Sequence, residues 1–465
     1  MQAPRVAFHT FGCKLNQYET EALASAFRSN GFHVVEERED ADVHVINTCT
    51  VTSRADHKAR TLIRAVAQRR PDEPVIVTGC SAQTEAEALA ALADNVVVVP
   101  QSEKARLLAA PAVLARALEA GESGVGALRT AVAAEVGRTG QADPFALVAG
   151  EYSFHTRAFL KIQDGCDCRC AYCRVPLARG DSVSLGLDEV LRRAVELEAR
   201  GSREIVLTGV NVSAWKATGA GSGGGAGLSE LLGRLLGATA RVRFRITSLE
   251  PEAIDAELVA AVSHPRVCPH FHIPVQSGSD DVLLRMRRRY RVQKVRDDVR
   301  ELRAARGDPF VAADILVGFP GETAEDHART LDLVRELELA AVHVFPFSPR
   351  PGTAAAEMRP FVPERVRGER AREVAALGAE LGAAYGRRWT GRQVDVLLEA
   401  GASRRRKAGA AAVSSAETAR GVSENYLKVE VHGIPADAAV PGRIARTEIT
   451  AAGTVCSGNF IRFQA

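Results

Sequence analysis

Four cysteines lie within eight positions of the segment KIQDGCDCRCAYCRVPLARG, residues 161–180. Three of them, Cys166, Cys170 and Cys173, have the spacing C-x3-C-x2-C. Three closely spaced thiolates can hold three irons of a 4Fe–4S cluster and leave the fourth iron open to another ligand. The remaining thiol, Cys168, keeps a second interpretation open, because four cysteines can also close a tetrahedral structural zinc site. The spacing favours the open cluster, with Cys168 as a spectator or a competitor for iron.

Three further cysteines each follow a strand-like segment near the N-terminus. Cys13 follows RVAFHTFG, Cys49 follows DVHVINT and Cys80 follows PVIVTG. The carboxyl ends of parallel strands meet at the sheet edge where ligands bind, so these three thiols would come together. The alternative is three separate buried cysteines that behave as small hydrophobes. Three such placements in one small domain favour a second three-cysteine cluster with an open iron.

The composition describes an ordinary globular protein. The chain has 465 residues, a length sufficient for two or three domains. Of these residues 46% are hydrophobic and 25% are charged. The net charge of +3 identifies no partner. No apolar run approaches the ~20 residues that span a bilayer, and the start MQAPRVAFHT leads directly into a strand. We therefore expect a cytoplasmic protein without a membrane segment, in which nine reduced cysteines serve metal binding or catalysis.

The order of strand and helix patterns predicts an α/β chain with three domains and a linker. Residues 1–110 alternate between strand and helix, which predicts an open sheet of parallel strands. Residues 111–151 are rich in Ala and Gly and predict a partly helical linker. Residues 152–388 contain six β/α units, which predict a partial, open (β/α) barrel. Residues 389–465 have short strands between turns, as in a small all-β barrel. The six strands are expected at 158–163, 204–209, 243–248, 270–275, 311–317 and 341–346.

The C-x3-C-x2-C motif, the aromatic residue before its last cysteine and the six-unit barrel resemble the radical S-adenosylmethionine superfamily. Over nearly the whole chain, apart from the linker and two inserts, the sequence resembles the methylthiotransferase family within it. Its motifs occur in order as FGCKLNQYETE, INTCTVT, VTGCSAQ, TGVN, RITSLEP, PHFHIPVQSGSD, MRRRY, DILVGFPGET and FPFSPRPGT.

This resemblance implies two 4Fe–4S clusters and S-adenosylmethionine as cofactors. One S-adenosylmethionine would donate a methyl group to sulfur at the N-terminal cluster, and another would supply the 5′-deoxyadenosyl radical. The sequence identifies neither the reductant nor the sulfur donor. Gly209 and Glu250 are expected beside S-adenosylmethionine; the alternatives are a tight turn at Gly209 and a solvated loop carboxylate at Glu250. The implied ligands are Cys13, Cys49 and Cys80 for the first cluster and Cys166, Cys170 and Cys173 for the second, which chelates S-adenosylmethionine.

The C-terminal barrel resembles the TRAM domain, an RNA-binding module, and implies tRNA as the partner. Arginines neutralise phosphates, and aromatic rings stack on unpaired bases. Tyr290 and Tyr426 are candidates for stacking, and the basic run 285–291 is a weaker candidate for RNA contact. Solvated faces are the alternative for such runs. The candidate phosphate contacts are Arg404, Arg405, Arg406 and Lys407.

Two tRNA-modifying branches resemble the chain, and both act on the adenosine just 3′ of the anticodon. GCKLNQYET, NTCTVT and PLARG are similar to the branch that methylthiolates N6-threonylcarbamoyladenosine, and the other branch, acting on isopentenyladenosine, usually differs at Thr50 and Val51. Arg174 is a candidate cation for the substrate carboxylate, unless it faces solvent or pairs with Asp167. A ribosomal-protein branch usually carries Pro where this chain has Lys14. A non-catalytic RNA-binding protein with structural zinc is the alternative from another class.

Overall fold

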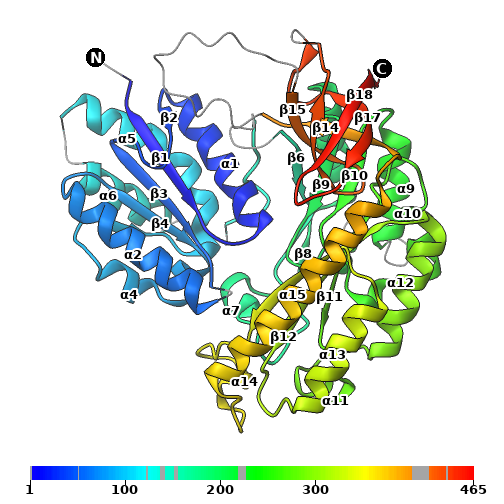
Figure 1. Ribbon diagram of the computed structural model, residues 1–465. Helices are drawn as coiled ribbons and strands as arrows, with labels where there is room; N and C mark the ends of the chain where they lie inside the picture. The colour runs from blue at the N-terminus through cyan, green and yellow to red at the C-terminus, as the bar shows by residue number, and fades with distance from the viewer. Residues whose placement is uncertain are drawn as a thin grey trace. The chain divides into compact units, whose positions relative to one another are not determined.

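The computed structural model describes residues 3–50, 52–121, 124–136, 142–150, 156–217, 227–400, 418–435 and 438–464 (Figure 1). The chain divides into two compact units. The first comprises Met1–Phe154, Lys161–Val183 and Arg350–Thr353. The second comprises His155–Leu160, Ser184–Pro349 and Ala354–Ala465. The cysteine-rich segment thus belongs to the same unit as the N-terminal cysteines.

The first unit contains the parallel sheet that the sequence predicts. Its five strands pair in the order β2-β1-β3-β4-β5, and all four pairings are parallel. Thr10 at the end of β1 lies opposite Asn47 of β3, and Thr48 lies opposite Gly79 of β4, so three strands end at nearly the same level. The strands are β1 (Arg5–Thr10), β2 (His33–Val35), β3 (Val43–Thr48), β4 (Val75–Gly79) and β5 (Val96–Val98).

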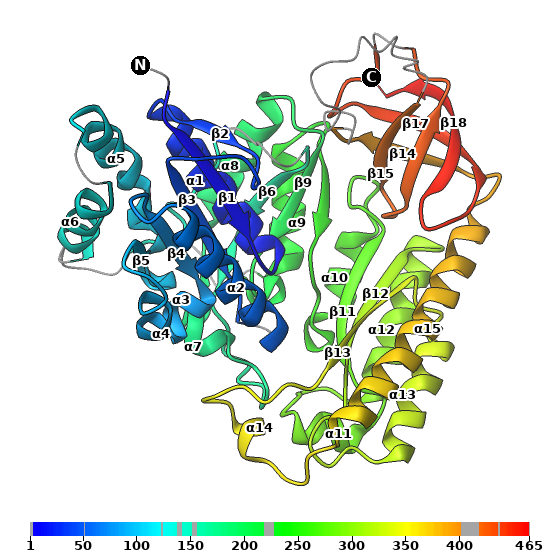
Figure 2. The same cartoon turned by 60° about the vertical axis from the view of Figure 1, so that its left-hand side comes forward.

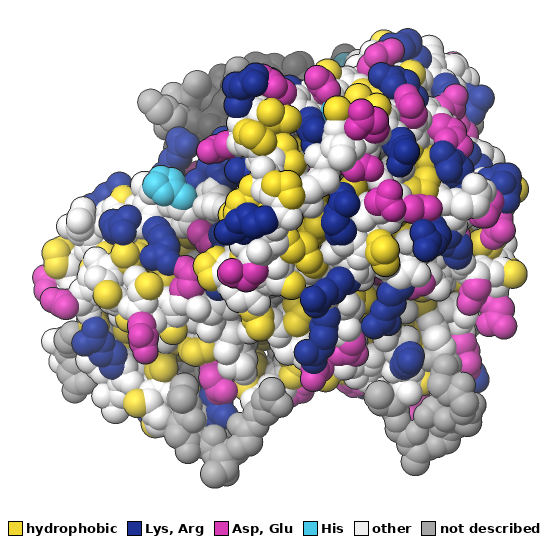
Figure 3. All heavy atoms as spheres, turned by 90° about the horizontal axis from the view of Figure 1, so that it is seen from below, with side chains coloured by type: hydrophobic (Ala, Val, Ile, Leu, Met, Phe, Trp, Pro, Cys, Tyr) yellow, Lys and Arg dark blue, Asp and Glu magenta, His cyan; other side chains and the backbone are white. Residues whose placement is uncertain are grey.

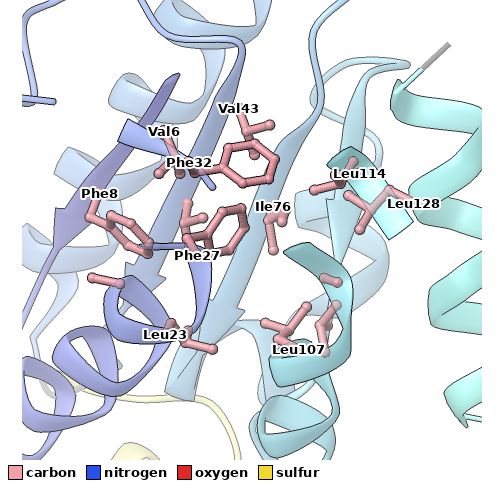
Figure 4. Close-up of a cluster of buried hydrophobic side chains, with 14 of the residues drawn as sticks. Val6, Phe8, Leu23, Phe27, Phe32, Val43, Ile76, Leu107, Leu114 and Leu128 are labelled. Carbon is pink, nitrogen blue, oxygen red and sulfur yellow. The ribbon is translucent and has the colours of Figure 1, made fainter. Parts of the chain in front are cut away.

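A hydrophobic core on one side of this sheet joins the strands to the helix at 14–29 and to the helices within residues 101–136 (Figure 4). Phe27 packs edge-on against Phe8 and Phe32, with ring centroids 5.6 and 5.0 Å apart. Leu114 and Leu128, from the region expected to be a linker, are fully buried in the same core. The helices of the unit are α1 (Lys14–Ser29), α2 (Ser53–Arg69), α3 (Cys80–Thr84), α4 (Ala86–Ala90), η1 (Gln101–Ala109), α5 (Ala110–Glu119), α6 (Gly124–Val136) and α7 (Val175–Arg179).

The second unit contains the six strands predicted for a partial barrel. They form two three-stranded sheets, β10-β9-β6 and β11-β12-β13. The pairs β9–β10, β11–β12 and β12–β13 are parallel, as β/α units require. The strands are β6 (Ala158–Lys161), β9 (Glu204–Thr208), β10 (Arg243–Ile246), β11 (His270–Gln276), β12 (Phe310–Val317) and β13 (Ala341–Pro346); the short strands β7 (Gln163–Asp164) and β8 (Val183–Ser184) lie nearby in the sequence.

Helices alternate with these strands, and the longest, α15, packs along β13 (Figure 2). The packing is close at Gly378, where a side-chain Cβ would lie 2.9 Å from Cβ of Val342. The helices are α8 (Leu187–Ala199), η2 (Val212–Ala214), α9 (Leu228–Ala238), η3 (Pro251–Ala253), α10 (Ala256–Val262), α11 (Asp280–Arg285), α12 (Val292–Arg306), α13 (Ala324–Glu336), α14 (Ala354–Glu357) and α15 (Glu364–Arg388).

The last five strands close into the small barrel that the sequence predicts, in the order β14-β15-β16-β18-β17. Its core is continuous with residues that precede it in the second unit, because Phe310 and Tyr385 belong to the same hydrophobic cluster. The strands are β14 (Gln393–Leu398), β15 (Thr418–Ser423), β16 (Lys428–His432), β17 (Ile444–Ala451) and β18 (Cys456–Phe463).

Charge is spread rather than gathered on the face shown in Figure 3, where Lys and Arg side chains alternate with Asp and Glu. Among the described residues, no helix is long and apolar enough to cross a membrane.

Candidate functional site

The first three cysteines lie at the carboxyl edge of the parallel sheet. Cys13 precedes α1 and follows β1, Cys49 directly follows β3, and Cys80 is the first residue of α3 after β4. The three strands are neighbours in the sheet. The topology therefore gathers three thiols that are far apart in the sequence.

Glycines allow the backbone to approach closely at this edge. Gly12 has φ +98°, and a Cβ there would lie 2.6 Å from Cβ of Cys49. Gly79 has φ +100°, and a Cβ there would lie 2.3 Å from the carbonyl oxygen of Thr48. No side chain fits at such distances, and left-handed φ values favour glycine. These glycines hold the turns that carry Cys13 and Cys80 against the end of β3.

The charges at this edge influence one another. Burial raises the pKa of the Cys80 thiol, and a thiolate at Cys13 raises it further, whereas Arg179 and Lys104 act in the opposite direction. Cys13 is exposed, while Cys49 and Cys80 are buried. The edge is thus open to solvent at one of its three sulfurs.

The second set of cysteines lies on the loop between β7 and α7. A hydrogen bond from Cys168 lowers the pKa of Cys166, although burial and the neighbouring thiolates of the loop oppose this effect. Gly165 has φ +68°, and a Cβ there would lie 1.9 Å from the carbonyl oxygen of Asp181. The loop therefore begins at a position that only glycine can occupy.

Both sets have the donor chemistry that 4Fe–4S clusters require, since such clusters are held by Cys thiolates. All nine cysteines are free thiols. Among the described residues, no three His, Cys, Asp or Glu side chains already converge on a common metal position. The fold thus brings the cysteine-bearing backbone segments together in the first unit, and the thiol chemistry of the residues fits two clusters.

Arg174, the candidate cation for a substrate carboxylate, is 6% exposed and already paired. It donates to the Glu85 carboxylate at 2.7 Å and to the Thr50 hydroxyl at 3.1 Å. Both alternatives for this side chain are wrong, because it neither faces solvent nor pairs with Asp167, which accepts from the backbone of Ser182.

Two residues expected near S-adenosylmethionine lie in the second unit. Gly209 directly follows β9, and Glu250 precedes η3. Glu250 is not a fully solvated loop carboxylate: its side chain is half-buried, with 17% of it exposed, and it forms an ion pair with Arg288. Burial raises its pKa to about 7, although Arg288 opposes the shift.

None of the residues expected to contact RNA is confirmed as a contact. Arg404, Arg405, Arg406 and Lys407 lie outside the described residues. Tyr290 is 5% exposed, and its hydroxyl donates to the backbone of Val275 at 3.2 Å. The Tyr426 ring lies 4.2 Å from the ring of His270 and beneath the guanidinium of Arg245. Both tyrosines contact other residues of the second unit. The burial of Tyr290 contradicts the prediction that it stacks on RNA bases, whereas stacking by the half-buried Tyr426 stays a prediction.

Sequence reasoning missed a buried ionic network beside the cysteines. Glu19 of α1 and Arg179 of α7 are central to it. The motifs YETE and PLARG mark these two residues, but no local pattern shows that they meet across 160 positions.

Comparisons with known proteins agree with the arrangement of the site. Residues 5–100 match the uncharacterized protein family UPF0004, and residues 160–334 match the radical SAM superfamily. The chain is similar to the threonylcarbamoyladenosine tRNA methylthiotransferase MtaB of Treponema pallidum, with 38% identity covering 94% of this chain and 97% of the relative. The protein of the same name from Bacillus subtilis is 34% identical, covering 98% and 96%.

A relative with a different printed substrate also matches. The tRNA-2-methylthio-N(6)-dimethylallyladenosine synthase of a Parafrankia species is 36% identical, covering 85% of this chain and 78% of the relative. Among solved structures, the radical S-adenosylmethionine methyltransferase TsrM from Kitasatospora setae has a TM-score of 0.51 at 16% identity, covering 76% of this chain and 74% of that one. That likeness concerns the fold alone. The identity over nearly the full length, together with two cysteine sets in one unit, shows that the chain belongs to the methylthiotransferase family of radical S-adenosylmethionine proteins.

Proposed function

We propose that the protein converts N6-threonylcarbamoyladenosine in tRNA, just 3′ of the anticodon, to its 2-methylthio derivative. The main observation in support of this function is that a C-x3-C-x2-C loop and three strand-end cysteines lie in one compact unit. Relatives of 34–38% identity named for this activity support the substrate. We also propose the cytoplasm as its location, because its substrate is a tRNA.

We assign the second cysteine set to the cluster that chelates S-adenosylmethionine, and the first set to the cluster where sulfur is methylated. When bound, these groups supply radical generation and sulfur transfer. The target carbon–hydrogen bond is not acidic, so proton abstraction by a base is not a route. The role of the protein is to bind and orient the reacting groups and to exclude water from them. The Cys13 turn and the Cys166 loop carry these tasks in the first unit, and Gly209 and Glu250 are proposed S-adenosylmethionine contacts.

The proposed domains are residues 1–110, 111–151, 152–388 and 389–465, with the helices of the second segment packed on the core of the first domain and with RNA binding in the last. A cationic and aromatic face on this barrel supports that role. The Arg443 guanidinium lies 3.5 Å from the ring centroid of Phe463, which is 4.7 Å from that of Phe460. Arg443, Ile461 and Arg462 are exposed.

We propose this face as a tRNA contact in place of the buried Tyr290. Arg443→Ala and Phe463→Ala should each weaken tRNA binding, and Arg443→Ala should reduce the salt dependence of the affinity. Arg365→Ala, an exposed arginine on α15, is the matched control. Unchanged affinity in both barrel variants would assign the contact elsewhere. Point variants suit this test because deletion of the barrel would uncover Phe310 and Tyr385.

The cysteine assignment is tested by two triple variants purified without oxygen. Replacing Cys166, Cys170 and Cys173 by Ala should abolish cleavage of S-adenosylmethionine to 5′-deoxyadenosine. Replacing Cys13, Cys49 and Cys80 should leave some cleavage and no methylthiolated tRNA. Normal product from the second variant would contradict the division of labour, and a colourless, zinc-containing protein would favour the non-catalytic RNA-binding alternative.

The substrate is tested by deleting the gene and analysing tRNA nucleosides by mass spectrometry. We expect loss of 2-methylthio-threonylcarbamoyladenosine and accumulation of its unthiolated precursor. The Parafrankia relative makes the isopentenyl product the second candidate. Loss of that product, or loss of methylthiolation from a ribosomal protein alone, would contradict the assignment.

A further inference from the structure

Five charged side chains form a buried network between the two cysteine sets. Each of the five is at most 5% exposed, and there are three cations and two carboxylates. All belong to the first unit. We call this set the buried network; its members are Glu19, Lys104, Lys161, Asp164 and Arg179.

Arg179 is the member that joins the cysteine-rich loop to α1. Its guanidinium donates to both Glu19 oxygens at 2.9 and 3.1 Å and to the Asn16 side-chain oxygen at 2.8 Å. The same group donates to both oxygens of Asp164 at 3.1 Å. Asp164 lies two residues before Cys166. One planar guanidinium thus holds the start of the loop and the first turns of α1 together.

Asn16 continues this connection to the N-terminal cysteines. Its side-chain nitrogen donates to the carbonyl of Phe11 at 2.8 Å and to the carbonyl of Thr48 at 2.9 Å. Phe11 lies two residues before Cys13, and Thr48 directly precedes Cys49. A chain of hydrogen bonds therefore runs from the segment before one cysteine set to the segments before two cysteines of the other.

The lysines complete the network around Glu19. Lys104 donates to Glu19 at 2.6 Å and to Asn47 at 3.0 Å, and Lys161 donates to Glu19 at 3.1 Å and to Asp164 at 2.6 Å. Burial alone would raise the pKa of Glu19, but the three cations outweigh it and hold that pKa well below its ordinary value. The carboxylate is ionised, and it fixes all three cations through bonds of defined direction.

We infer that Arg179 is a positioning residue: through Glu19, Asn16 and Asp164 it fixes the distance and orientation between the two cysteine sites. Radical formation and sulfur transfer must act on one substrate base, and misplacement by about 1 Å can cost up to about a hundredfold in rate. Arg179 therefore couples the two half-reactions without touching the substrate. This inference rests on the proposed assignment of the two cysteine sets.

The test compares Arg179→Met, Arg179→Lys and Glu19→Gln in the reconstituted full-length enzyme. The measured quantity is methylthiolated tRNA formed per 5′-deoxyadenosine released. Arg179→Met should lower this ratio by about ten- to a hundredfold while cleavage of S-adenosylmethionine continues. Arg179→Lys should restore part of the ratio, because one cation returns without the planar fork. Arg5→Met, which removes an exposed pair with Glu39 in the same unit, should leave the ratio unchanged.

A second measurement uses the metal-free protein. Amide hydrogen exchange in residues 161–183 should be faster in Arg179→Met and Glu19→Gln than in wild type or Arg5→Met. An unchanged ratio with unchanged exchange would overturn the inference, and so would equal losses of cleavage and product, which indicate a merely structural role. If Arg179→Met does not fold, Glu19→Gln, which keeps the side-chain size, decides in the same way. Failure of the cysteine assignment itself would appear separately, as normal product from the triple variant that lacks Cys13, Cys49 and Cys80.

Discussion

Replacing Glu204 by Gln should destabilise the second unit more than any surface substitution. Glu204 of β9 is 1% exposed and accepts from Arg245 at 2.8 and 3.0 Å and from Arg243 at 2.7 Å. The two arginines also reach the C-terminal barrel. Arg245 donates to the carbonyl of Ser423 at 3.1 Å, and Arg243 donates to that of Asp395 at 2.8 Å. One carboxylate thus keeps two buried cations in place where β10 meets the barrel.

The expected loss is about 3–5 kcal/mol, the usual cost of removing one partner from a buried ion pair. The size follows from burial, because both guanidiniums lose their neutralising charge where water cannot replace it. With a urea m-value of about 3 kcal/mol/M, the transition midpoint of the unit should fall by about 1–1.7 M.

The assay is urea unfolding followed by tryptophan fluorescence. The chain has two tryptophans, Trp215 and Trp389, and both lie in the second unit, so the signal reports on that unit. Glu230→Gln is the control, since it removes an exposed pair with Arg234 and should cost about 0.2–1 kcal/mol. A loss for Glu204→Gln no larger than that of the control would refute the reasoning.

The pH dependence gives an independent check. Burial alone would raise the pKa of Glu204, but Arg245 and Arg243 outweigh it and hold the pKa well below its ordinary value. A lowered carboxylate pKa contributes stability that is present above the unfolded-state pKa of about 4.3 and is lost as the pH falls. The stability difference between wild type and Glu204→Gln should therefore be full at pH 7 and shrink below about pH 4.

Three further predictions concern the cysteine sites and cofactor contacts. Gly12→Ala should cost about 1–3 kcal/mol and lower iron binding, as measured by unfolding and iron analysis, because its Cβ would overlap Cys49; a stable variant with full iron content would contradict this. Cys168→Ala should keep iron content and cleavage of S-adenosylmethionine, and loss of the cluster would place Cys168 among the ligands. If Glu250 accepts from the cofactor ribose, its pKa of about 7 means that affinity for S-adenosylmethionine falls by up to about tenfold per unit below pH 7, whereas Glu250→Gln should show a flat profile by anaerobic calorimetry.

The sequence by itself predicted the parallel sheet, the six-stranded partial barrel and the terminal β-barrel. These follow from local signals, namely the period of apolar residues and the turns between them. It also predicted that Cys13, Cys49 and Cys80 lie at one sheet edge, because each follows a strand and parallel strands end together. The parallel direction of the strands was sufficient for that inference, and no side-chain contact was needed.

Only the tertiary structure decided the partners of the buried polar side chains. Arg174 reads as an available cation in the sequence, and Tyr426 reads as an available ring, yet each is occupied by neighbours more than 80 positions away. Glu19 and Arg179 appear as ordinary members of two motifs, and their pairing spans 160 positions. The physical reason is that burial makes such partners obligatory, since an unpaired charge inside a protein is costly. Which partner each group takes depends on how the elements pack, and no local pattern of residues records that.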